Sequence, residues 1–164
     1  MTALIAAFAD NRVMGKNGRL PWHIPEDLKR FRSLTEGHTV IMGRRSFEEI
    51  GRALANRQTI VLSRNPAFTA EGCTVARSLT EAISRADRTE IFIAGGASVY
   101  AEALPLCDRL YITRIDARFD GDTFFPDFDE TAFSLTEETA VSGEIPCRFL
   151  TYDRIRHKTS AENL

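Results

Sequence analysis

The fold is decided by a stretch in which an apolar run leads directly into a helical pattern: Thr39-Val40-Ile41-Met42-Gly43-Arg44-Arg45-Ser46-Phe47-Glu48-Glu49-Ile50-Gly51. The first four residues have no charged face, as is typical of a strand covered on both sides of its sheet. Ser46 and Glu49 have the spacing of a capping box, which predicts a short helix from Ser46, and Gly51 is a typical residue to end it. A buried strand followed at once by a helix is the building unit of an α/β sheet.

The same alternation of strand and helix recurs along the chain. Further strands are predicted at 2–8, 59–62, 90–94 and 110–113, and further helices at 25–35, 79–86 and 97–104. This order favours a mostly parallel sheet with helices on its faces. After residue 108 the helical patterns stop, and Tyr111–Thr113 and Phe149–Tyr152 are expected to pair antiparallel. The sequence therefore predicts one α/β domain with a mixed sheet.

Residues that follow the strands carry the first indications of function, because ligands of open α/β sheets bind beyond the carboxyl ends of strands. Arg44–Ser46 place two cations and a hydroxyl at a helix N-terminus, where backbone N–H groups also favour anions. Ser63–Arg64 follow the next strand, and Gly95–Gly96 permit close backbone approach after a third. Each feature alone has a plain structural reading as a capped helix, a solvated loop charge or a tight turn. Together they indicate a nucleotide with several phosphates.

A single acid interrupts the apolar face of the first predicted helix, in Leu20-Pro21-Trp22-His23-Ile24-Pro25-Glu26-Asp27-Leu28-Lys29-Arg30-Phe31. Pro25 suits the first helical position, and Ile24, Asp27, Leu28 and Phe31 then share one face. Residues 26, 29 and 30 are expected on the solvent side. A carboxylate among apolar side chains costs free energy unless a partner satisfies it. Asp27 is therefore either held by backbone N–H groups and the helix dipole, or kept for a ligand.

Composition excludes several classes of function. The 164 residues are 43% apolar and 27% charged, and the net charge of −2 gives no argument for nucleic acid or an anionic membrane. No apolar run approaches the roughly 20 residues that span a bilayer. Residues 2–9 lack the basic region of a signal peptide, so a buried first strand is expected there.

Cysteine and histidine usage indicates neither a metal site nor a disulfide framework. Cys73, Cys107 and Cys147 form no CxxC pair, and the three histidines show no ligand spacing. A reducing cytoplasm is therefore expected. We expect the domain to cover 1–157, and the polar tail 158–164 to lie outside it, because its last three residues match the start of a common purification tag.

Several motifs also stand in a characteristic order: Leu4-Ile5-Ala6-Ala7, Gly15…Leu20-Pro21-Trp22…Asp27-Leu28…Phe31, Val40-Ile41-Met42-Gly43-Arg44, Ile50-Gly51-Arg52…Leu54…Arg57, Gly95-Gly96…Val99-Tyr100 and Gly121-Asp122-Thr123…Phe125-Pro126. Their order and spacing over about 3–153 resemble the dihydrofolate reductase family. The resemblance implies a central eight-stranded, mostly parallel mixed sheet with about four flanking helices and C-terminal antiparallel strands. It also implies NADPH-dependent reduction of 7,8-dihydrofolate to tetrahydrofolate, with hydride added at C6 and a proton at N5.

On the catalytic side, the resemblance implies that Asp27 accepts hydrogen bonds from the 2-amino group and N3 side of the pterin. Because Asp27 would lie too far from N5 to protonate it directly, a water is the expected proton donor, with Asp27 shaping the electrostatics. Trp22 would position a water near the pterin, although a buried anchor is its plain structural reading. Leu20 and Tyr100 complete the implied catalytic set.

On the substrate side, the implied slot for the p-aminobenzoyl ring consists of residues that would otherwise be taken for core: Leu28, Phe31, Ile50 and Leu54. Arg57 would bind the glutamate α-carboxylate with its planar guanidinium. The other implied substrate contacts are Ile5, Ala94 and Thr113.

On the cofactor side, Arg44, Ser63 and Arg64 would bind the 2′-phosphate that distinguishes NADPH from NADH. The implied cofactor site is Ala6, Ala7, Met14, Gly15, Gly18, Leu20, Gly43, Arg44, Arg45, Ser46, Leu62, Ser63, Arg64, Gly95, Gly96, Ala97, Ser98, Val99, Tyr100 and Thr123. Residues 9–24 correspond to the mobile active-site loop of the family. Asp122 would bond that loop and hold it closed, although sequence alone favours an ordinary turn residue.

The chain departs from the family pattern at a few positions. Ser46 stands where Thr is usual, and Ala53–Asn56 lacks the usual prolines. Ala94 stands where a larger aliphatic residue is common, so a wider pterin pocket and an altered affinity for diaminopyrimidine antifolates are expected.

Two other functions stay open: a related NADPH-dependent reductase of a riboflavin-pathway pyrimidine, and a catalytically silent NADPH-binding protein. The expected partner is dihydrofolate, and diaminopyrimidine and pteridine antifolates are expected inhibitors. A monomer that uses no metal, nucleic acid or membrane is expected.

Overall fold

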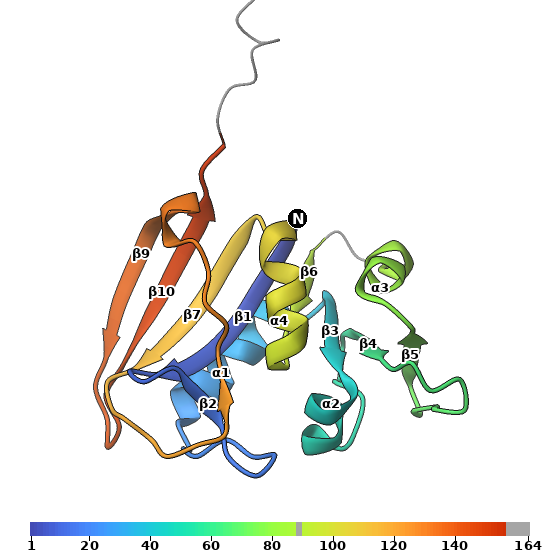
Figure 1. The fold of residues 1–164 in the computed structure, drawn as a ribbon, viewed down its shortest axis with the longest axis horizontal. Coiled ribbons are helices and arrows are strands. Elements are labelled where there is room, and N and C mark those ends of the chain that lie inside the picture. The colour runs from blue at the N-terminus through green and yellow to red at the C-terminus, as the bar shows by residue number, and fades with distance from the viewer. Residues whose placement is uncertain (88–89, 157–164) are drawn as a thin grey trace, which may run out of the picture.

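An eight-stranded sheet forms the centre of the structure, a computed structural model that describes residues 1–87 and 90–156 (Figure 1). The strand order across the sheet is β5-β4-β3-β6-β1-β7-β10-β9. The strands are β1 (Thr2–Ala9), β3 (Thr39–Gly43), β4 (Gln58–Leu62), β5 (Cys73–Ala76), β6 (Ile91–Ile93), β7 (Arg109–Ile115), β9 (Phe133–Val141) and β10 (Cys147–Arg154). All pairings from β5 to β7 are parallel, and β10 pairs antiparallel with β7 and β9. The predicted mixed sheet and its antiparallel C-terminal pair are confirmed.

Four helices cover the two faces of this sheet, as Figure 1 shows with α4 in front and α1 behind. Within the described residues they are α1 (Pro25–Thr35), α2 (Arg44–Ile50), α3 (Leu79–Arg85) and α4 (Ala97–Ala103). Two 3-10 turns follow, η1 (Leu104–Leu106) directly after α4 and η2 (Glu130–Ala132) directly before β9. Alternate residues of β1 point to opposite faces: Leu4 packs with α3 and α4, whereas Ile5 packs with α1 and α2. This division explains why the strands are apolar on both sides. Among the described helices, none has the length and apolarity that a bilayer crossing requires.

The predicted capping box before α2 is wrong. The helix begins two residues earlier, at Arg44, with Gly43 as its N-cap and no side-chain hydrogen bond at the cap. Gly43 instead donates its backbone N–H to the Gly95 carbonyl at 2.8 Å, so the end of β3 is held by the β6 side of the sheet. Ser46 consequently lies within the first turn, where its hydroxyl faces Gly95. Gly51 does end the helix, in the left-handed conformation that glycine adopts without strain.

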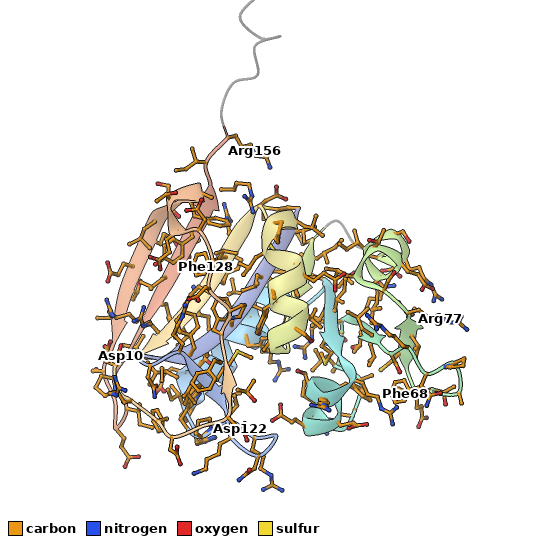
Figure 2. All side chains as sticks on the ribbon, viewed as in Figure 1. Asp10, Phe68, Arg77, Asp122, Phe128 and Arg156 are labelled. Carbon is orange, nitrogen blue, oxygen red and sulfur yellow. The ribbon has the colours of Figure 1, made fainter. Side chains whose placement is uncertain are left out.

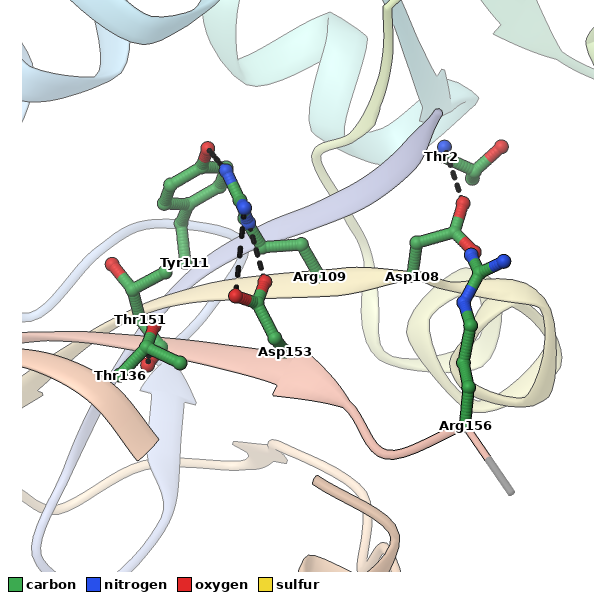
Figure 3. Close-up of polar contacts among 8 residues, drawn as sticks. All are labelled: Thr2, Asp108, Arg109, Tyr111, Thr136, Thr151, Asp153 and Arg156. Atoms are coloured by element: carbon green, nitrogen blue, oxygen red, sulfur yellow. Dashed lines mark hydrogen bonds and ion pairs between the residues drawn. The ribbon is translucent and has the colours of Figure 1, made fainter. Parts of the chain in front are cut away.

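The first and last described segments of the chain meet beside β7 (Figure 3). Arg156 pairs with Asp108 at 2.6 Å, and the other carboxylate oxygen of Asp108 accepts the backbone N–H of Thr2 at 3.1 Å. Arg109 also pairs with Asp153 across the β7–β10 ladder at 2.6 Å. These contacts fix the end of the described domain, whereas the expected boundary at 157 and the tail 158–164 lie outside the described residues.

A small second sheet, of β2 (Val13–Gly15) and β8 (Thr123–Phe124), closes one end of the domain. Gly121 lies in its tightest place, because a Cβ atom there would stand 2.4 Å from Val13 Cγ1 and 2.6 Å from the Gly15 carbonyl oxygen. One of these atoms belongs to the backbone, which cannot turn aside as a flexible side chain does. The approach of the two segments therefore requires glycine at position 121.

We predict that Gly121→Ala lowers the free energy of unfolding by about 1–3 kcal/mol, the usual cost of overpacking. Gly143→Ala is the matched control, because a Cβ atom at this position would meet nothing within 4 Å. It should change stability by less than about 0.5 kcal/mol. Denaturant unfolding of both variants measures the difference, and equal stabilities would contradict the packing argument.

Candidate functional site

An apolar cavity of about 400 Å³ opens between β1, α1, α2 and the β6–α4 turn. Its lining is Ile5, Ala6, Ala7, Met14, Leu20, Asp27, Leu28, Phe31, Arg32, Ser46, Glu49, Ile50, Leu54, Arg57, Ala94, Gly95, Gly96 and Tyr100. Leu28 and Ile50 are 52% and 42% exposed, so the alternative that they are core residues is wrong. Exposed apolar side chains gathered around a cavity, as here, are typical of a ligand site.

Two carboxylates line this cavity, Asp27 from α1 and Glu49 from α2, and Asp27 is bonded to the sheet. Its Oδ1 accepts a hydrogen bond from the Thr113 hydroxyl at 2.6 Å, and Thr113 is buried in β7. Asp27 does lie in the first turn of α1, where the helix dipole favours an acid, but among the described residues no backbone N–H donates to its carboxylate and no ion pair includes it. Burial raises the pKa of Asp27, against the opposing effects of the Thr113 hydrogen bond and the charge of Arg30.

Tyr100 and Trp22 present two different kinds of polar group near the cavity. The Tyr100 hydroxyl donates to the Ile5 carbonyl at 2.7 Å, and burial raises the pKa of this phenol, so it stays neutral. Trp22 packs edge-on against Phe119, and its buried indole N–H has no hydrogen-bond partner among the described residues. Such an orphaned donor suits a bound water or ligand. Trp22 and Thr113 are the only predicted site residues that line neither the cavity nor the groove described below.

Two arginines stand at the mouth of the cavity. Arg57 donates to the Ala55 carbonyl at 2.9 Å and to the Thr35 hydroxyl at 3.1 Å. Burial and, to a smaller extent, the neighbouring charge of Arg32 lower the pKa of Arg57, as expected where two cations share one opening. Sequence reasoning missed Arg32, although it lies four residues after Leu28 and so on the same helix face.

A second, polar groove of about 860 Å³ adjoins the cavity and shares Met14, Ser46, Glu49 and Gly96 with it. Its lining is Met14, Gly15, Gly18, Gly43, Arg44, Arg45, Ser46, Glu49, Leu62, Ser63, Arg64, Arg77, Ser78, Leu79, Gly96, Ala97, Ser98, Val99, Glu102, Asp122 and Thr123. Four arginines meet there from the ends of β3, β4 and β5, which makes the groove suitable for phosphates. Sequence reasoning missed Arg77 because the strand before it, β5, was not predicted.

Arg44 is held in place by neighbours on both sides. Its Nε donates to Glu48 at 2.8 Å, and its guanidinium lies 4.5 Å from the ring centroid of Phe68. Figure 2 shows Phe68 and Arg77 near β5, and Asp122 near β2. These contacts orient Arg44 while leaving its terminal nitrogens for an anion in the groove.

The predicted loop contact of Asp122 is present in the structure. Its Oδ2 accepts the backbone N–H of Asn17 at 3.0 Å, and its own backbone N–H donates to the Gly15 carbonyl at 3.0 Å. The hydrogen bond from Asn17 is the main reason why the pKa of Asp122 is lowered. Asp122 thus joins the segment before β8 to the loop that follows β2.

The fold and the two adjoining sites define the class of protein: an α/β enzyme whose apolar substrate cavity, lined by Asp27, adjoins an arginine-rich nucleotide groove beyond the strand ends. Comparison with known proteins narrows this class, because residues 1–154 match the family model of dihydrofolate reductase. The chain belongs to the dihydrofolate reductase family.

Individual relatives agree over nearly the full chain. A dihydrofolate reductase type 3 of Salmonella typhimurium is 45% identical over 161 residues, which cover 95% of this chain and 99% of that protein. The dihydrofolate reductase of Bacillus subtilis is 45% identical over 136 residues, covering 82% of this chain and 81% of that protein. The structure of the Enterococcus faecalis enzyme, complexed with NADP(H) and RAB-propyl, has a TM-score of 0.89 and 42% identity, covering 94% and 96% of the two chains.

The raised pKa of Asp27 leads to a prediction about stability. Below the unfolded-state pKa of about 4, the carboxyl is protonated in both states, and Asp27→Asn should leave stability nearly unchanged. As the pH rises through the raised folded-state pKa, the native protein has to ionise a buried group and loses the stability that the protonated form contributed. The variant should therefore become the more stable protein at neutral pH, by about 1 kcal/mol.

Thermal unfolding of both proteins between acid and neutral pH measures this difference. A constant stability difference across the pH range would contradict the burial of Asp27 as the cause.

Proposed function

We propose that this protein reduces 7,8-dihydrofolate to 5,6,7,8-tetrahydrofolate with NADPH. The observation that carries the proposal is the Asp27 carboxylate, which stands in an apolar cavity with a single neutral donor, Thr113. A flat heterocycle with an amino group and a ring N–H supplies the donors that this carboxylate lacks. The family membership points to the same pterin substrate.

The substrate would enter with its pterin ring innermost and its charged end at the opening. Leu28, Ile50 and Phe31 offer apolar walls for the aromatic ring in the middle of the molecule. Arg57, already oriented by Thr35 and Ala55, would bind the terminal carboxylate. Ala94 leaves more space at the inner end than a larger aliphatic residue would, so we expect an altered affinity for diaminopyrimidine antifolates.

The polar groove fits NADPH. Arg44, Arg64 and Ser63 lie together where the 2′-phosphate would bind, and Gly96 with Ala97 and Ser98 would hold the pyrophosphate at the start of α4. The groove and the cavity share Met14, Ser46, Glu49 and Gly96, so the two bound molecules would lie side by side. NADPH supplies the hydride when it is bound there.

The residues of the chain would control the proton that accompanies the hydride. Asp27 stabilises positive charge on the pterin, which favours protonation at N5 by a water. Trp22 has a buried N–H free to hold such a water, and Tyr100 remains a neutral donor to the β1 backbone. The loop after β2, joined to Asp122, would cover the reacting atoms and exclude bulk water.

The two alternatives differ in what they require of the cavity. A pyrimidine reductase would use the same groove but not the apolar ring slot or Arg57, and a silent binding protein would not need Asp27. An absorbance assay of NADPH oxidation, first with dihydrofolate and then with the pyrimidine, separates the two enzymes.

We also propose a monomer in the cytoplasm; three free cysteines suit a reducing compartment.

We predict that Asp27→Asn lowers turnover of dihydrofolate at neutral pH by at least about a hundredfold, because the negative charge beside the pterin is lost. Activity should recover in part at acid pH, where dihydrofolate itself carries more of the N5 proton. NADPH binding, followed by fluorescence, is the internal control and should be unchanged. Full turnover at pH 7 would remove Asp27 from the proposed role.

We further predict that Arg44→Ala weakens NADPH binding by roughly 10- to 100-fold, because a charge-assisted hydrogen bond to phosphate is lost. NADH, which lacks the 2′-phosphate, should be little affected. Arg118→Ala is the matched control, because Arg118 is exposed and lines neither the cavity nor the groove. Equal losses of affinity for the two cofactors would show that Arg44 does not bind the 2′-phosphate.

A further inference from the structure

Arg30 lies in a different place from the one its sequence position predicts. The helical pattern assigns it to the solvent side of α1, but it is partly buried against the sheet. Its guanidinium lies 4.4 Å from the ring centroid of Phe149 and 5.7 Å from that of Tyr111. It also donates to the Ile112 carbonyl at 3.4 Å. Arg30 therefore spans from α1 to both β7 and β10.

These contacts place a fixed positive charge next to the Asp27–Thr113 hydrogen bond. Ile112 directly precedes Thr113 in β7, and Phe149 is the residue of β10 that pairs with Thr113. Arg30 is also one helical turn after Asp27, on an adjoining part of the α1 surface. The arginine and the acid thus approach the same point of β7 from the same helix, but they do not form an ion pair within the part of the chain that the structure describes.

We propose that Arg30 is a positioning residue, whose guanidinium is held by Phe149 and Ile112 so that it keeps Asp27 ionised without binding it. A direct ion pair would occupy the carboxylate oxygens that the pterin needs. Anchoring the guanidinium on an aromatic face and a backbone carbonyl avoids this, because both groups attract a cation without carrying a negative charge themselves. The proposal rests on the proposed function only in naming the pterin as the group that Asp27 binds.

Other titratable groups face this pair but do not replace the charge of Arg30. Tyr100 from α4 and Cys147 from β10 are buried, and burial raises the pKa of both, so they are neutral where Asp27 titrates. Burial lowers the pKa of Arg30, and the charges of Asp27, Tyr111 from β7 and Glu137 from β9 act in the opposite direction. Arg30 is the cation among the described residues that opposes the effect of burial on the pKa of Asp27.

The proposal is tested by following the titration of the Asp27 carboxyl carbon by NMR in the ligand-free protein. Arg30→Met keeps much of the length of the side chain and removes its charge, and the titration midpoint of Asp27 should rise by roughly 0.5–1 pH unit. Arg30→Lys keeps the charge and should restore most of the native midpoint. Lys29→Met is the matched control, because it removes an exposed cation from the same helix and should leave the midpoint unchanged.

An unchanged midpoint in Arg30→Met would overturn the proposal, as would equal shifts in Arg30→Met and Arg30→Lys. A shift in Lys29→Met as large as that in Arg30→Met would also overturn the proposal, because the loss of any cation from α1 would then have the same effect. Arg30→Gln provides the same measurement where Arg30→Met does not fold. In the active enzyme, the acidic limb of kcat/KM for dihydrofolate should move to higher pH in parallel. The titration needs no turnover, so failure of the proposed reaction and failure of the role of Arg30 remain distinguishable.

Discussion

The site depends on one hydrogen bond between a helix and a strand, which Thr113 of β7 donates to Asp27 of α1 at 2.6 Å. The carboxylate is otherwise placed among apolar side chains, and burial of this kind opposes its ionisation. A neutral hydroxyl lowers that cost in part and fixes the direction of the carboxylate, yet leaves acceptor positions free. An arginine in place of Thr113 would stabilise the charge more, but it would also satisfy the oxygens that a ligand has to bind.

The groove beside this cavity is a consequence of parallel pairing. Because β3, β4 and β5 run in the same direction, the arginines that follow each of them meet at one edge of the sheet. The close backbone contact of Gly43 with Gly95 joins the end of β3 to the turn before α4. The arginine-rich groove and the apolar cavity are therefore adjacent, as the proposed hydride transfer between two bound molecules requires.

Much of the fold and the site could be predicted from the sequence, because the relevant patterns are local. The bounds of α1, the paired strands β7 and β10, and most residues that line the cavity and the groove follow from periodicity, from Pro25 and from the family motifs. The edge strands β5 and β9 were missed: β9 is exposed over most of its length and has no apolar face to reveal it. The helix start at Arg44 was also missed, because a backbone contact across the sheet replaced the side-chain cap.

The sequence by itself determined which residues could share a face and which acid would stand among apolar neighbours, since helix and strand periods depend only on local spacing. Only the tertiary structure decided which partners those residues meet. It brought Thr113 to Asp27 across 86 positions, turned Arg30 from solvent onto Phe149, and added Arg77 to the groove. The physical reason is that such contacts depend on strand order, register and the placing of helices on the sheet, which are set by the packing of the whole domain.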